Sequence, residues 1–258
     1  MSEAPLHQRI NEPAYVRWAA ANAADIHLFM IHNARVKLVA TQLPQADVIV
    51  DLGGAAGSLY DMGYPYNFKK LIIVDLPPDD RHEMYRGLEL KNRDTPQGPI
   101  YTLLTSMTDL STIPSNSTDL VWSGQSIEHI TRKEAKLMYQ EVIRILRPGG
   151  HFCLDTPNRL LTEIHVAGSQ WVHPEHKIEY YPSTLQADLR NAGFTIADQL
   201  GVVEMINTRR AGSIDYRDFY IGSGLSTNLE GSYAQYYKCM VSEHAAGGEV
   251  ASSAERSE

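Results

Sequence analysis

The stretch VIVDLGGAAG, residues 48–57, decides the fold prediction for this chain. Its first half is a short, continuous apolar run rich in β-branched residues, which is typical of a strand buried on both faces of a parallel sheet. Asp51 lies near the end of this run, and a glycine-rich turn follows it. Ligands of open parallel sheets bind beyond the carboxyl ends of the strands, so this turn is the first candidate binding site.

Outward from this stretch, strand-like and helix-like segments alternate. Further strands are predicted at 71–78, 101–104, 119–123, 151–156, 194–200 and in the stretch SYAQYYKCMV that ends the ordered pattern. Helical apolar spacing covers 14–42, a capping box at 131–134 begins a helix that PGG at 148–150 ends, and Ser183 with Gln186 begins a helix that ends at Gly193. Such alternation predicts a doubly wound, Rossmann-like α/β domain with a seven-stranded, mostly parallel sheet and helices on both faces.

The same pattern suggests how the chain is divided. We expect residues 1–46 to form a helical segment that covers the site, and residues 47–242 to form a single domain. Two segments of that domain, near 157–182 and 203–232, do not fit the alternation and are predicted as long loops over the active site. Residues 243–258 have little to bury and are predicted to be disordered.

Composition narrows the class of protein. The 258 residues contain 23 Lys and Arg against 31 Asp and Glu, with no basic block, which disfavours binding of bulk nucleic acid. The two cysteines, Cys153 and Cys239, lie in separate strand-like runs and offer neither a disulfide framework nor a zinc cluster. No signal peptide pattern and no apolar run near the ~20 residues of a membrane span is present. We expect a soluble, cytoplasmic protein without membrane contact; a homodimer is left open.

The glycine-rich turn has the wrong register for a dinucleotide. The pattern G-x-G-x-x-G fails when counted from Gly53 and fails again when counted from Gly54. Asp51 would also repel a pyrophosphate, whereas it would attract a cofactor that carries an ammonium and a sulfonium group. Both observations oppose a nicotinamide oxidoreductase and favour a cationic ligand.

With these residues the chain resembles the Rossmann-like, class I S-adenosylmethionine-dependent methyltransferases over roughly residues 47–200. Asp51 and the glycines match the family motif D/E-x-G-x-G-x-G, with Ala55 in place of the middle glycine. Asp75 matches the acidic residue that binds the ribose hydroxyls, and Asp109 matches the aspartate near the adenine amine, although Thr108 replaces the glycine before it. The segments 119–130 and LRPGG at 146–150 resemble the fourth strand and the turn before the fifth. The resemblance implies S-adenosyl-L-methionine as cofactor, bound by Asp51, Gly53, Gly54, Ala55, Gly57, Asp75, Leu76, Asp109, Leu110, Ser123 and Gln125.

His129 is the candidate catalytic residue, because it follows the fourth strand on the cofactor side and an imidazole can accept a proton near neutral pH. A packed histidine is the alternative. In ubiquinone-type O-methyltransferases a similar stretch, E-x-x-E-H, is associated with a divalent metal, but Gln125 replaces its first carboxylate here, so we expect no metal. His173 and His176 form H-x-x-H in a loop, where this spacing has little geometric meaning.

The sequence therefore predicts a methyltransferase that uses S-adenosylmethionine and acts on an oxygen or nitrogen of a small polar acceptor, such as a sugar or a natural-product intermediate. Two alternatives stay open. The acceptor could be RNA or protein, for which the charge pattern offers no recognition surface. The chain could also be a catalytically silent subunit that binds the cofactor without turnover.

Overall fold

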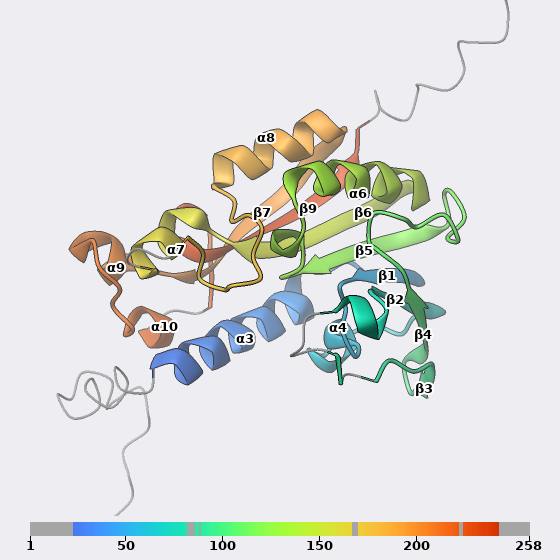
Figure 1. Ribbon diagram of the computed structural model, residues 1–258, viewed down its shortest axis with the longest axis horizontal. Coiled ribbons are helices and arrows are strands. Elements are labelled where there is room, and N and C mark those ends of the chain that lie inside the picture. Colours follow the sequence, from blue (N-terminus) through green and yellow to red (C-terminus); the bar gives the residue numbers. More distant parts are fainter. Residues whose placement is uncertain (1–22, 82–85, 88, 167–169, 222–223, 243–258) are drawn as a thin grey trace, which may run out of the picture.

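The computed structural model describes residues 23–81, 86–87, 89–166, 170–221 and 224–242. The described strands form one mixed sheet of nine strands in the order β3-β4-β2-β1-β5-β6-β9-β7-β8, with helices on both faces (Figure 1). The strands are β1 (Val48–Leu52), β2 (Lys70–Asp75), β3 (Arg93–Thr95), β4 (Gly98–Leu104), β5 (Thr118–Gly124), β6 (Leu146–Pro157), β7 (Phe194–Glu204), β8 (Leu225–Ser226) and β9 (Ser232–Val241).

The Rossmann-like class is confirmed, but the predicted number of seven strands is wrong. Strands β4, β2, β1, β5 and β6 are parallel neighbours, and β9 runs antiparallel between β6 and β7. The two additional strands, β3 and β8, lie at the two edges and are antiparallel to their neighbours. They have three and two residues, too few for an apolar alternation to be recognised in the sequence.

Alternate residues of the central strands point to two separate apolar layers. Ile49 and Trp122 belong to a layer with residues of α3 (Ala23–Gln42) and α4 (Ser58–Asp61), whereas Val50 and Val121 belong to a layer with residues of α6 (Arg132–Ile145) and α8 (Pro182–Ala192). In Figure 1 α6 and α8 lie on one side of the sheet and α3 on the other. Period-two alternation in strands covered on both faces gives this arrangement.

The ends of the two long helices after β5 differ from their predicted positions. The capping box of Thr131 and Glu134 is present, but α6 ends at Ile145. Leu146 is already extended, and Arg147, the residue before Pro148, is also biased away from the helical conformation. Ser183 does not begin α8, since the helix starts one residue earlier, with Pro182 in its first turn and Tyr181 as N-cap. Gly193 ends α8 in the left-handed conformation, as predicted.

The two segments predicted as long loops contain short helices. The first holds α7 (Arg159–His165), where the Asn158 side chain accepts a hydrogen bond from the amide of Leu160. The second holds α9 (Ile206–Ala211) and α10 (Asp218–Ile221), and the Asp218 carboxylate accepts hydrogen bonds from two amides at the start of α9. The loop prediction was therefore wrong, because helices of four to seven residues depend on such caps and on packing rather than on an apolar period.

Parts of the sequence-based prediction concern residues outside the described part of the chain. The predicted helical segment 14–42 is described from residue 23 onward, and residues 14–22 lie outside the described part of the chain, as does the tail 243–258. Among the described helices, none has the length and apolarity that crossing a membrane would require.

Candidate functional site

The carboxyl ends of β1 and β5 mark the point where the strand order reverses. From β1 the chain continues to β2 on one side and later returns to β5 on the other side of β1. Asp51 of β1 lies opposite Trp122 of β5, and Leu52 lies opposite Ser123, so both strands end at the same edge. A crevice for a ligand is expected at such a switch point.

Close packing fixes the residue types of the turn after β1. Gly53 has φ +68°, and a Cβ there would lie 2.7 Å from the Cβ of Ser126 in the segment that follows β5. At Gly54 a Cβ would lie 2.5 Å from Oδ2 of Asp51. Ala55 has φ +48°, a conformation that costs a non-glycine residue roughly 1 kcal/mol. The backbone of the turn thus approaches both β1 and the segment after β5 closely.

Asp51 is a buried carboxylate with an unsatisfied oxygen. It is 1% exposed, and its Oδ2 has no hydrogen-bond partner among the described residues. Burial raises the pKa of Asp51 to about 7, although the backbone amide of Leu59 and the charge of Arg35 act in the opposite direction. A nearby cation would favour the charged form of this group, so the residue fits a positively charged ligand.

Asp75, at the end of β2, supports the same turn. Its Oδ2 accepts a hydrogen bond of 2.9 Å from the amide of Ala55, and its Oδ1 accepts one of 2.8 Å from the amide of Leu76. Nε of Arg81 lies 3.4 Å from Oδ1. Because a carboxylate oxygen can accept more than one hydrogen bond, these contacts are compatible with a further role toward ribose hydroxyls.

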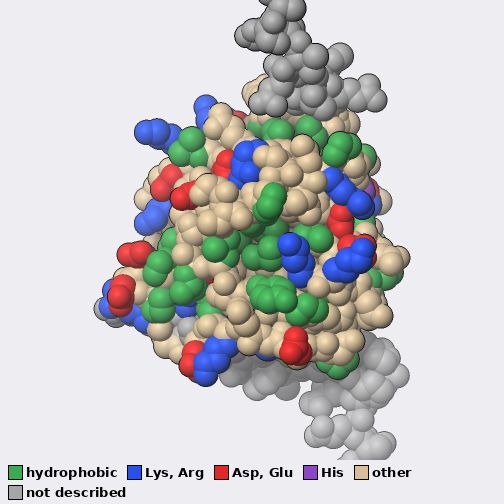
Figure 2. Space-filling model, turned by 90° about the vertical axis from the view of Figure 1, so that its right-hand side faces the viewer, with side chains coloured by type: hydrophobic (Ala, Val, Ile, Leu, Met, Phe, Trp, Pro, Cys, Tyr) green, Lys and Arg blue, Asp and Glu red, His purple; other side chains and the backbone are tan. Residues whose placement is uncertain are grey.

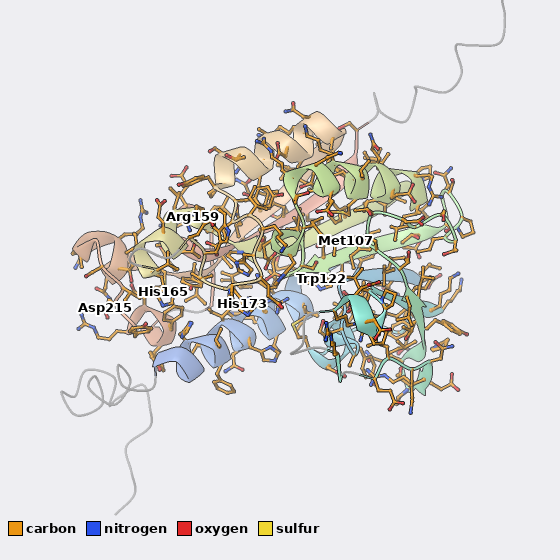
Figure 3. All side chains as sticks on the ribbon, in the orientation of Figure 1. Met107, Trp122, Arg159, His165, His173 and Asp215 are labelled. Atoms are coloured by element: carbon orange, nitrogen blue, oxygen red, sulfur yellow. The ribbon has the colours of Figure 1, made fainter. Side chains whose placement is uncertain are left out.

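In the segment after β4, the residue that lies beside the glycine turn is not one of the predicted cofactor residues. Asp109 is exposed, and the hydroxyl and the amide of Ser111, both hydrogen-bonded to its carboxylate, hold the pKa of Asp109 below its ordinary value. Leu110 is fully buried. Met107, which the sequence did not single out, has its Cε 3.6 Å from where a Cβ of Gly53 would lie (Figure 3). A methionine beside a glycine turn has no sequence signature that would have identified it.

Gln125 and Asp155 form the centre of a polar network at this edge. Gln125 has φ +54°, and its Nε2 donates a hydrogen bond of 2.7 Å to Oδ2 of Asp155. Arg35 of α3 donates two hydrogen bonds to the same carboxylate, of 2.8 Å from Nε and 3.2 Å from Nη2. Ser123 is buried, with its Oγ 2.7 Å from Oγ of Ser126. Asp155 and Arg35 were not predicted, although the aspartate at the end of HFCLDT repeats the pattern of Asp51 and could have been noticed.

His129 lies in the 3-10 helix η2 (Ile127–His129), directly after β5. Its ring centroid is 5.0 Å from that of His176 and 6.0 Å from that of His173, so the loop histidines of the sequence lie beside it. Burial, together with His176, His173 and Lys177, lowers the pKa of His129 to about 4. His129 is thus neutral near pH 7, and its low basicity makes it a weak general base. His165 lies elsewhere, hydrogen-bonded to Tyr233 and Tyr216.

The predicted cofactor residues are distributed over the ends of four neighbouring strands. Hydrogen bonds join Asp75 to Ala55, and close packing joins Gly53 to Ser126, next to Gln125. Asp109 instead contacts Ser111 in its own loop. The structure therefore brings the turn, Asp75 and the segment after β5 into direct contact, whereas Asp109 has no described hydrogen bond to the turn.

Comparison with known proteins identifies the same region. Residues 50–154 match the family model described as a methyltransferase domain, a range that includes all the predicted cofactor residues. A probable S-adenosylmethionine-dependent methyltransferase of Mycolicibacterium smegmatis (strain ATCC 700084 / mc(2)155) is 34% identical over 107 residues, which is 40% of each chain. The match thus spans less than half of that relative.

Solved structures share the fold over most of the chain. A possible histamine N-methyltransferase from Thermotoga maritima has a TM-score of 0.58 at 15% identity, covering 90% of this chain and 96% of the other. A SAM-dependent methyltransferase from Archaeoglobus fulgidus has a TM-score of 0.55 at 13% identity, covering 87% and 98%. At these sequence identities the similarity shows a shared fold and nothing further.

Proposed function

We propose, from the premise that this chain carries a class I S-adenosylmethionine-dependent methyltransferase domain, that it transfers a methyl group to an oxygen or nitrogen of a small polar acceptor. A sugar or a natural-product intermediate is the class of acceptor we favour. The observation that carries the proposal is Asp51, a buried carboxylate with an unpaired oxygen at the strand switch point. A buried charge of this kind is costly without a partner, and a cationic cofactor provides one.

Each cofactor residue has a role in this proposal. Asp51 attracts the positive charge of the cofactor's amino acid part, and Gly53, Gly54, Ala55 and Gly57 allow the backbone to approach it. Asp75 and Leu76 bind the ribose, Asp109 and Leu110 lie beside the adenine, and Ser123 and Gln125 complete the opposite wall. Supporting observations are the hydrogen bond from Ala55 to Asp75 and the contact of Gly53 with the segment after β5.

The acceptor is proposed to lie beside η2 and the loop that carries His173 and His176. S-adenosylmethionine supplies, when bound, an electrophilic methyl group on its sulfonium. The chain's own residues then align the acceptor and exclude water. On the face drawn in Figure 2, Lys and Arg side chains are interspersed with Asp and Glu, and no continuous basic patch crosses it. Together with the net charge of −8, this favours a small acceptor over RNA.

The first experiment is calorimetric titration of the purified chain with S-adenosylmethionine and, in parallel, with NADH. We expect micromolar binding of the methyl donor, and at least about 10-fold weaker binding by Asp51→Ala and Asp75→Ala, because each removes a direct contact worth about 1.4 kcal/mol or more. Asp94→Ala, an exposed aspartate of the edge strand β3, is the matched control and should bind normally.

Turnover is then measured as S-adenosylhomocysteine formed with panels of hydroxyl and amine acceptors. Methylation of such an acceptor supports the proposal. Binding of NADH alone would overturn it, and tight cofactor binding without turnover on any acceptor would instead indicate a silent subunit. Methylation confined to RNA, with binding that weakens steeply as salt rises, would identify a different acceptor class.

A further inference from the structure

We propose that Glu128, His129 and His176 form a binding site for a divalent transition-metal ion. One ligand atom from each residue lies within 4.8 Å of the corresponding atoms of the other two. Two of the residues come from η2 and the third comes from the loop before α8, so the cluster exists only in the folded chain. Two imidazoles and one carboxylate can hold an ion while leaving further positions open.

Glu128 provides the second observation that points to a ligand at the cluster. Its side chain is fully buried, and Thr156 donates a hydrogen bond of 2.8 Å to its Oε2. The other oxygen, Oε1, has no hydrogen-bond partner among the described residues. A buried carboxylate oxygen without a donor costs free energy, and a metal ion between Glu128 and the two histidines would satisfy it.

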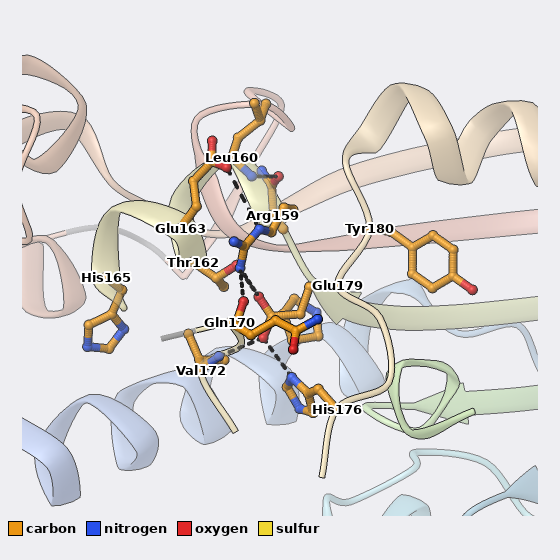
Figure 4. Close-up of polar contacts among 12 residues, drawn as sticks. Arg159, Leu160, Thr162, Glu163, His165, Gln170, Val172, His176, Glu179 and Tyr180 are labelled. Carbon is orange, nitrogen blue, oxygen red and sulfur yellow. Dashed lines mark hydrogen bonds and ion pairs between the residues drawn. The ribbon is translucent and has the colours of Figure 1, made fainter. Parts of the chain in front are cut away.

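His176 is oriented as a ligating histidine would be. Its Nδ1 lies 2.7 Å from Oε1 of Glu179, a carboxylate that also accepts hydrogen bonds from the amide of Val172, from Thr162 and from Arg159 (Figure 4). Because this carboxylate acts as an acceptor toward all its neighbours, Nδ1 of His176 carries the proton and Nε2 keeps its lone pair. Histidine ligands are commonly fixed by a carboxylate in this way.

His129 gives the cluster an open side. Its side chain is 32% exposed, whereas Glu128 and His176 are buried, so an ion can enter past His129. Nδ1 of His129 lies 4.0 Å from Oε2 of Glu175, which adds a second carboxylate near the open side. An oxygen of a small molecule could complete the coordination there.

The structure also removes the reason for expecting no metal. That expectation rested on Gln125 as a poor ligand in the sequence Gln-Ser-Ile-Glu-His. Gln125 takes no part in the cluster, because its amide is hydrogen-bonded to Asp155, and His176 supplies the third ligand instead. A site with two imidazoles is better suited to zinc, iron or cobalt than to magnesium or calcium, which prefer oxygen ligands.

A role for this ion rests on the proposed function and narrows the acceptor to a hydroxyl compound. Coordination lowers the pKa of a bound hydroxyl. Its O–H bond then breaks with the proton passing to water, the oxygen electron pair forms the bond to the methyl carbon, and the bond from carbon to sulfur breaks with its pair remaining on sulfur.

Metal binding is tested without reference to activity. The full chain is stripped with a chelator and titrated with Co²⁺, followed by its visible absorption, and with Zn²⁺ by calorimetry. We expect one ion of either metal per chain, displacement of Co²⁺ by Zn²⁺, and no competition from Mg²⁺. Glu128→Gln and His176→Asn should each weaken binding by at least about 10-fold. His151→Asn, in β6 and outside the cluster, should bind normally.

Urea unfolding of each variant controls for loss of structure. If Glu128→Gln or His176→Asn does not fold, His129→Asn, whose side chain is partly exposed, carries the test. Failure of Co²⁺ and Zn²⁺ to bind at one ion per chain, or equal binding by folded variants and wild type, would overturn the metal site. Calorimetry with S-adenosylmethionine on the same variants distinguishes failure of the metal site from failure of the proposed methyltransferase function. Cofactor binding should be unchanged in the metal-site variants.

Discussion

At the scale of single residues, two buried aspartates of the site have opposite surroundings. Asp155 is fully buried but receives hydrogen bonds from Arg35 and Gln125. Asp51 is as deeply buried, yet one of its oxygens has no described partner. A group that weakens the fold in this way is characteristic of functional sites, where binding rather than stability determines the residue.

The burial of Asp51 predicts how the stability of the protein depends on pH. Because the pKa of Asp51 is about 7 in the folded chain against an ordinary value of 3.8, the folded state binds more protons between these values, and its stability falls as pH rises from about 4 to 7. Asp51→Asn should remove this loss and stabilise the ligand-free protein above pH 7, by at most about 4 kcal/mol.

Urea unfolding of wild type and Asp51→Asn at pH 5 and pH 8 measures this effect. The variant should gain stability relative to wild type at pH 8 and gain much less at pH 5. Asp94→Asn, on the exposed strand β3, serves as the control. A variant that is less stable than wild type at pH 8 would show that Asp51 makes a favourable contact in the ligand-free chain.

At the scale of elements, α3 is attached to the site by both apolar and ionic contacts. Leu38 and Val39 are fully buried in the layer beneath the sheet, and Arg35 on the same helix binds Asp155 at the end of β6. The Arg35 side chain is only 13% exposed, so water screens this pair weakly. The helix thereby lies close to the network that includes Gln125.

Removal of one partner of this pair should be costly. Arg35→Ala leaves the Asp155 carboxylate buried with Gln125 as its remaining described side-chain donor, and we expect a loss of about 3 kcal/mol in the free energy of unfolding. In the double mutant with Asp155→Asn the losses should not add, with a coupling energy of about 1 to 3 kcal/mol.

A second ion pair provides the comparison for this double-mutant cycle. Arg132 and Asp188 join α6 to α8, but the Arg132 side chain is 52% exposed, so the same cycle there should give a smaller coupling energy. Equal coupling in both cycles, measured by urea unfolding, would show that the pair between α3 and β6 is not a special feature of the site.

At the scale of the whole molecule, the two apolar layers share one sheet, which favours a single cooperative unfolding transition. The family match ends at residue 154, within β6, and contains the predicted cofactor residues. His176 and Glu179, which complete the proposed metal site, lie beyond it. The region that matches the methyltransferase domain therefore contains the predicted cofactor residues, whereas His176 of the proposed metal site comes from the rest of the chain.

A cofactor that binds only the folded chain should raise the Tm of this single unfolding transition. At a concentration 100 times its Kd, S-adenosylmethionine should stabilise the chain by about 2.7 kcal/mol. For a chain of this size we expect a rise in Tm of about 5 to 10 °C, measured by calorimetric scanning. NADH should give no shift, and a rise produced by NADH alone would contradict the cofactor assignment.

Features with a local cause could be predicted from the sequence. Short apolar runs predicted β1, β2, β5 and β6, the capping box predicted the start of α6, and the glycines after Asp51 predicted a tight turn. These predictions succeeded because a buried strand, a capped helix and a tight turn each depend on neighbours within a few residues.

Contacts between side chains that are distant in the sequence could not be predicted without the fold. Arg35 and Asp155 are 120 positions apart, and Glu128 reaches His176 only when the loop before α8 packs on η2. The edge strands β3 and β8 likewise depend on their neighbours, because they are too short to show a period. Contacts of this kind leave no local pattern, since the energy that forms them comes from packing of the whole chain.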